Sequence, residues 1–72
     1  MIIACNRTKL KTKVGMLDAV MNPFSEKPRC LMLGNVVSVH ANNSRGMAPG
    51  KWKLVSITEH KDKSLLLAEF ER

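Results

Sequence analysis

The sequence predicts a mainly β domain with one short helix, in which four to five strands form a small, strongly curved antiparallel sheet or barrel. In size it compares with SH3-like or OB-like barrels, and an α+β arrangement is the alternative. Over residues 7–14 basic residues alternate strictly with Thr, Leu or Val, and this period of two is typical of a strand. The other apolar segments are short and are separated by Gly, Pro and Asn, which favour turns. With 72 residues the chain has room for one domain, residues 1–72.

The N-terminal segment predicts strand structure with a cationic side. Residues 1–5 are apolar and rich in isoleucine, which favours a short strand. In residues 7–14, basic residues alternate with Thr, Leu and Val, so that a strand would carry its charges on one side. We expect the basic side to face solvent and the other side to face the core. The basic side comprises Arg7, Lys9, Lys11 and Lys13, and the core side Thr8, Leu10, Thr12 and Val14.

Residues 15–22 are the predicted helix. Apolar residues recur there at three- and four-residue spacing, which places them on one stripe of a helix. The stripe comprises Val14, Leu17, Val20 and Met21, and Pro23 ends the element because the residue before a proline avoids the helical region. A strand over residues 16–21 is the alternative. Residues 24–28 then form a loop.

The second half of the chain predicts strands joined by turns. Residues 29–40 are expected to form a central strand, with a bulge or sharp bend at Gly34. Residues 41–50 are rich in Asn, Gly and Pro and form the longest loop. Residues 51–70 predict a hairpin with a polar turn near residues 60–63. Its first strand changes apolar side near Leu54, so either a bulge occurs there or both faces are covered.

The charge is high and uneven. The formal net charge is +6, and residues 1–53 carry nine Lys and Arg against two Asp and Glu. Such a field attracts nucleic acid, anionic lipid or an acidic protein surface. The sequence lacks the long apolar segment that a membrane helix needs, and its first residues do not follow a secretory signal pattern. Two cysteines make no disulfide framework, so we expect a reduced, cytoplasmic protein with no membrane contact.

The alternating cations are the candidate nucleic-acid-binding residues. Alternate residues of a strand lie about 6.6–6.8 Å apart, close to the spacing of successive phosphates, so Arg7, Lys9, Lys11 and Lys13 could follow one backbone. Lysines on an exposed edge strand also protect it from aggregation, which is the competing interpretation. Secondary contacts are expected from Arg45, Lys51 and Lys53, next to the long loop. Trp52 is either a platform for stacking a base or a core residue.

No pattern of catalytic or metal-binding residues is recognisable. Cys5, Cys30, His40 and His60 include no closely spaced chelating pair, and the Gly-rich segment 46–50 lacks the ending of a phosphate-binding loop. We therefore expect neither enzymatic activity nor a cofactor or metal.

The sequence thus predicts a non-enzymatic nucleic-acid-binding module that contacts the phosphate backbone of RNA or DNA through a basic strand face. The alternative is a small regulatory or inhibitory protein that binds an acidic surface of a larger protein. That protein–protein interaction would be anchored by an exposed sheet edge or by a patch around Met47 and Trp52. A homodimer is compatible with either function, since a chain this short builds only a small core.

Overall fold

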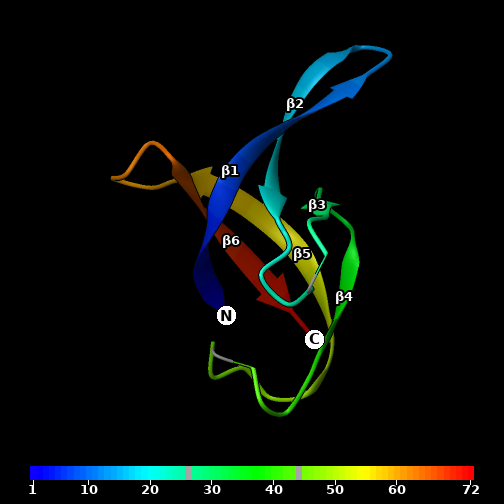
Figure 1. Cartoon of the computed structure of the whole chain (residues 1–72), viewed down its shortest axis with the longest axis vertical. Helices are drawn as coiled ribbons and strands as arrows, with labels where there is room; N and C mark the ends of the chain where they lie inside the picture. The colour runs from blue at the N-terminus through cyan, green and yellow to red at the C-terminus, as the bar shows by residue number, and fades with distance from the viewer. Residues whose placement is uncertain (26, 44) are drawn as a thin grey trace.

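In the part of the chain that the structure describes, six antiparallel strands form one curled sheet that makes a half-barrel (Figure 1). The computed structural model describes residues 1–25, 27–43 and 45–72. In the order β3-β2-β1-β6-β5-β4, the first and last strands are the two shortest. The strands are β1 (Ile2–Thr12), β2 (Gly15–Met21), β3 (Cys30–Leu31), β4 (Val36–Val39), β5 (Gly50–Glu59) and β6 (Leu65–Glu71). The expectation of a small, mainly β domain with a strongly curved antiparallel sheet is confirmed, but the described residues form six strands rather than the expected four to five.

The predicted helix over residues 15–22 is wrong, and the alternative strand is correct. Within the described residues no helix is present, and β2 pairs with β1 from Gly15 to Val20. A helix of this length is marginal in water, whereas β2 gains a hydrogen-bonded ladder with the preceding strand. The apolar stripe also fails as a core face, because Val14 and Leu17 are exposed while Val20 is fully buried.

Residues 29–40 do not form a central strand. They contain β3 and β4, which lie at opposite edges of the sheet and are separated by a turn at residues 32–35. Asn35 closes this turn, because its Oδ1 accepts a hydrogen bond from Met32 N at 2.9 Å and its own N–H donates to Met32 O. The predicted bend at Gly34 is thus a complete reversal of the chain, made at a φ of 91° that glycine adopts readily.

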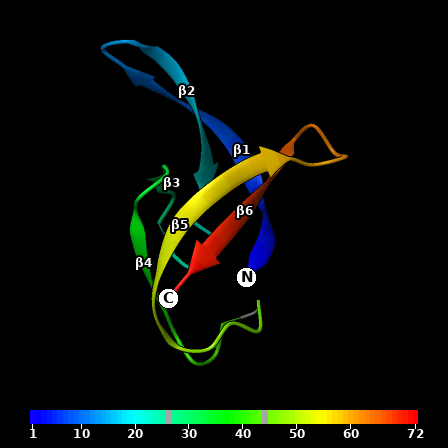
Figure 2. The ribbon, with the colours of Figure 1, turned by 180° about the vertical axis from the view of Figure 1, so that it is seen from behind.

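The C-terminal hairpin is confirmed. β5 and β6 pair along most of their length, and the pairing register shifts between Leu54 and Ser56. This irregularity is the bulge predicted near Leu54. It lets β5 curve strongly across the back of the molecule, as Figure 2 shows.

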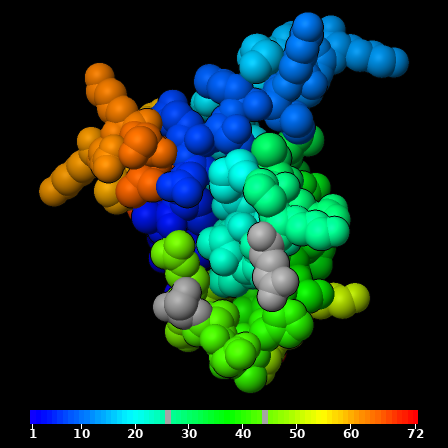
Figure 3. All heavy atoms as spheres, in the orientation of Figure 1, coloured from blue at the N-terminus to red at the C-terminus, as the bar shows by residue number. Residues whose placement is uncertain are grey.

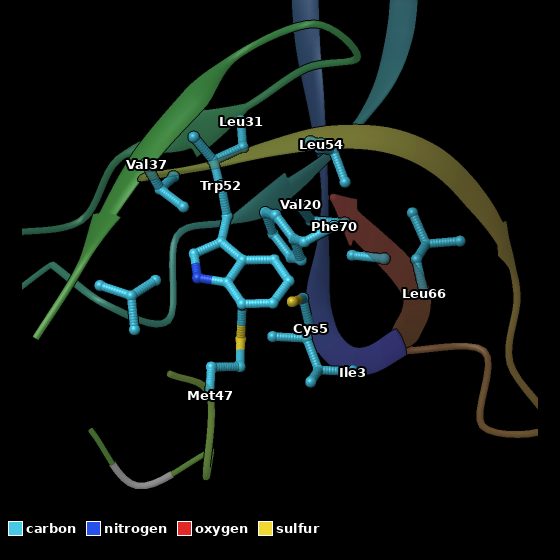
Figure 4. Packing of buried hydrophobic residues seen from close by; sticks show 12 residues of the cluster. Ile3, Cys5, Val20, Leu31, Val37, Met47, Trp52, Leu54, Leu66 and Phe70 are labelled. Carbon is cyan, nitrogen blue, oxygen red and sulfur yellow. The ribbon is translucent and has the colours of Figure 1, made fainter. Parts of the chain in front are cut away.

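The core fills the concave side of the half-barrel, where Phe70, Leu54, Leu66 and Val20 have the largest fully buried side chains. Phe24 packs edge-on against Phe70, with 6.0 Å between ring centroids. At one end of the core, Met47 points from the long loop toward the Trp52 ring (Figure 4). The described residues form no helix that is long and apolar enough to cross a membrane.

Candidate functional site

The four cations of β1 lie where this strand leaves the body of the protein. β1 pairs with β6 only as far as Asn6, with one further backbone hydrogen bond from Arg7 N to Ser64 O. From there it continues with β2 alone, in a register that runs from Arg7 opposite Val20 to Thr12 opposite Gly15. We call residues 7–18 the basic ribbon. Figure 3 shows its outer part, in blue and cyan, standing clear of the rest of the molecule.

A tight turn closes the basic ribbon at residues 13 and 14. The Thr12 hydroxyl donates a hydrogen bond to Gly15 O at 2.8 Å and accepts one from Val14 N at 3.3 Å. Gly15 has a φ of 123°, in a region that side chains disfavour. Glycine and threonine at these two positions therefore hold Lys13 and Val14 at the exposed tip.

The basic side of β1 is exposed at Lys9, Lys11 and Lys13, as expected, although these residues share their side of the strand with core residues. Ile3 and Cys5 are buried on the same side of the strand as Lys9 and Lys11. The opposite side is only half-buried at Thr8, Leu10 and Thr12, and Val14 is 89% exposed. The core ends at Cys5 and Val20, so the outer ribbon has no interior to face and both of its sides meet solvent.

Two of the four cations form ion pairs with carboxylates. Arg7 contacts Glu59 of β5, and Lys9 contacts Asp18 directly opposite on β2, with 2.6 Å between Nζ and Oδ1. The hydrogen bond and the charge of Lys9 hold the pKa of Asp18 below its ordinary value. Lys11 lies opposite Met16, and the structure shows no carboxylate partner for Lys11 or Lys13 among the residues it describes. The outer half of the ribbon therefore carries uncompensated charge.

Sequence reasoning did not predict the Lys9–Asp18 pair. The signal was present, because a two-residue turn at residues 13 and 14 places residue 9 opposite residue 18. The pairing was not predicted because residues 15–22 were expected to form a helix rather than a strand.

Exposed apolar side chains accompany the cations. On the ribbon, Val14, Met16 and Leu17 are exposed, Met16 by 57%. Leu17 also lines a shallow recess of about 280 Å³ together with Asp18, Met32 and Leu33. The ribbon thus combines positive charge with apolar surface.

The other predicted basic residues lie elsewhere. Arg45 belongs to the long loop and lines a recess together with Cys5 and Asn6, next to the base of the basic ribbon and away from its tip. Lys51 and Lys53 point away from the core, since the alternate residues Trp52 and Leu54 of β5 are buried. Lys53 also lies opposite Glu71 of β6. Lys51 and Lys53 therefore do not extend the surface formed by the basic ribbon, whereas Arg45 lies near its base.

Trp52 is a core residue. The residue is 9% exposed, and its indole N–H donates a hydrogen bond to Ala48 O at 3.0 Å. The Arg72 guanidinium lies over the ring, 5.5 Å from its centroid. Met47 is buried beside it, so the patch expected around Met47 and Trp52 is interior rather than surface.

The residues considered as metal ligands or catalytic groups do not come together in the structure. Cys5 is buried in β1, where desolvation raises the pKa of its thiol and the positive charge of Arg45 partly opposes that increase. Cys30 is exposed in β3. Among the described residues, no three His, Cys, Asp or Glu side chains are grouped so that they could hold a metal ion.

Comparison with known proteins adds no relationship, because no family model, curated protein or solved structure matches this chain.

Proposed function

We propose that this chain is a non-enzymatic module that binds nucleic acid through the phosphate backbone, with the basic ribbon as its contact surface. The observation that carries the proposal is the pair Lys11 and Lys13 at the end of a projecting, preformed ribbon without a carboxylate opposite them. Alternate side chains on a strand lie about 6.6–6.8 Å apart, a spacing that suits successive phosphates. Cations in such positions supply affinity and release counterions on binding.

In this proposal the four ribbon cations differ in importance. Lys11 and Lys13 make the main contacts, Lys9 contributes in competition with Asp18, and Arg7 is held by Glu59 at the base. Arg45, Lys51 and Lys53 add to the long-range attraction of the whole molecule. The two unpaired thiols support a reducing, cytoplasmic setting.

The test is the salt dependence of binding to a mixed nucleic-acid pool. The slope of log affinity against log salt concentration is negative, and each phosphate contact contributes about 0.9 to its magnitude for duplex DNA. The double variant Lys11→Gln, Lys13→Gln is therefore expected to reduce this magnitude by about two. The double variant Lys51→Gln, Lys53→Gln removes the same charge from another face and is expected to leave the slope almost unchanged. Equal effects of the two double variants would mean that net charge alone drives the attraction.

A specific observation also favours the second candidate, a small regulatory protein that binds an acidic protein surface. Exposed Val14, Met16 and Leu17 beside lysines form the kind of apolar and basic surface that protein interfaces use. A pull-down from a nuclease-treated lysate distinguishes the two. One stoichiometric protein retained after nuclease, and lost with Met16→Ser, favours this candidate over nucleic acid.

A further inference from the structure

We infer that the ligand of the basic ribbon is double-stranded DNA, with the ribbon lying in the major groove. The inference rests on the proposed function and narrows it to one class of nucleic acid. Three properties of the molecule support it: the burial of its aromatic rings, the dimensions of the ribbon, and the exposed apolar residues near the ribbon tip.

The aromatic rings disfavour a single-stranded ligand. Proteins that bind single strands stack the unpaired bases on exposed aromatic side chains. This chain has three aromatic residues, and all belong to the core or pack against it. Phe70 is fully buried, Phe24 packs edge-on against it, and Trp52 is buried with Arg72 over its ring. A single strand would therefore find cations on this protein but no stacking platform.

The ribbon has the dimensions that a major groove accepts. From Arg7 to Thr12 a strand advances about 17 Å at about 3.4 Å per residue. The major groove of B-form DNA is about 12 Å wide and about 8.5 Å deep and admits a two-stranded ribbon, whereas the minor groove is only about 6 Å wide. The major groove of A-form RNA is too narrow to be read by side chains. Double-stranded DNA is therefore the duplex that fits.

The ribbon is also formed before it binds. Its ladder with β2 and the Thr12 hydrogen bonds at the turn fix the backbone, so little ordering is needed on association. In the groove, Lys11 and Lys13 would reach the phosphates of the walls while Val14 and Met16 meet base edges. The C5-methyl group of thymine is the apolar contact available there.

The first test compares four probes of one mixed sequence, about two helical turns long. They are a DNA duplex, one of its single strands, the corresponding RNA duplex and the RNA single strand. The expected result is binding to duplex DNA at least about tenfold tighter than to the others, measured by fluorescence anisotropy at one salt concentration. Equal or tighter binding of a single strand or of duplex RNA overturns the inference. The proposed function survives that result if Lys11→Gln, Lys13→Gln still weakens binding, and it fails together with the inference if no probe binds.

The second test addresses the groove. Replacing thymine by uracil throughout the duplex removes methyl groups from the major groove only. The uracil duplex is expected to bind about fourfold more weakly for each methyl group that the protein contacts. This factor corresponds to the loss of one buried methyl group from the interface. The variant Val14→Ser, Met16→Ser should bind both duplexes equally, and circular dichroism checks that it is folded. Equal affinity of the wild-type protein for the two duplexes overturns the placement in the major groove.

Discussion

Lys9 and Asp18 face each other across the basic ribbon and form an ion pair, with 2.6 Å between Lys9 Nζ and Asp18 Oδ1. Both side chains are about half-exposed, so the pair is accessible to solvent and to a ligand. Asp18 is the only acid among residues 7–18. In the proposed function it competes with phosphate for Lys9 and lowers the charge that the ribbon can offer.

Removing this carboxylate is expected to strengthen binding. The variant Asp18→Asn keeps the shape of the side chain but releases Lys9, so the log–log salt slope should become steeper by about 0.9. At a fixed low salt concentration the affinity should rise by about two- to fivefold, in keeping with the modest strength of exposed ion pairs. Asp62→Asn is the matched control, because it makes the same charge change in the turn between β5 and β6. An equal gain from both variants would contradict a local role for Asp18.

The turn between β5 and β6 provides a prediction on pH and stability. The Asp62 carboxylate accepts hydrogen bonds from Ser64 N at 2.9 Å and Ser64 Oγ at 2.7 Å, and these bonds hold the pKa of Asp62 below its ordinary value. In the unfolded chain this pKa is about 3.9. The stabilisation is therefore fully present above that value and is lost as the pH falls through the lower pKa of the folded state.

The variant Asp62→Ala should accordingly have a lower Tm than the wild type at neutral pH. The difference should shrink as the pH falls below about 4 and vanish once Asp62 is protonated in the folded protein. Thermal unfolding followed by circular dichroism across this range measures it. A difference that stays constant with pH would show that Asp62 acts through the shape of the turn rather than through its charge.

The sequence predictions were right for elements that local residue patterns determine, and wrong for elements that only pairing with another part of the chain decides. Alternation over residues 7–14 and the polar turn near residues 60–63 are local signals, and β1 and the β5–β6 hairpin formed as expected. The spacing of Val14, Leu17 and Val20 suits a helix as well, and only the ladder with β1 decides for a strand. The sequence also did not predict that the exposed basic side continues the core side of the same strand. Lys9 and Lys11 share a side with buried Ile3 and Cys5, because the strand continues beyond the edge of the core.

The two cysteines are expected to differ in reactivity. Cys5 is buried and its thiol has a raised pKa, so little thiolate forms there at neutral pH, whereas Cys30 is exposed. One thiol per chain should react rapidly with an aromatic disulfide reagent in the native protein, and two in denaturant. Cys30→Ser should abolish the rapid reaction. Rapid reaction of two thiols in the native protein would contradict the packing of β1 against β6 around Cys5.

Leu54 and Leu33 lie on two backbone segments that are hydrogen-bonded to each other, one inside the core and one outside it. Substituting each of them tests which side chains form the core. Leu54 lies opposite Phe70 in the β5–β6 ladder and is fully buried, while Leu33 is 60% exposed in the turn between β3 and β4. The turn is joined to β5 by hydrogen bonds from Gly34 N to Leu54 O and from Leu54 N to Asn35 O. The same substitution can therefore be made on both sides of this contact, once inside the core and once outside it.

Leu54→Ala should lower the free energy of unfolding by about 2–5 kcal/mol, because it removes buried methyl groups and leaves a cavity next to Phe70. Leu33→Ala should change it by no more than about 0.5 kcal/mol. With a slope of about 1 kcal/mol per molar urea for a chain this small, the urea midpoint should fall by about 2 M or more for Leu54→Ala and stay nearly constant for Leu33→Ala. Similar shifts for both variants would mean that Leu33 is covered in solution. The exposed apolar surface beside the ribbon would then belong to an interface that forms without nucleic acid.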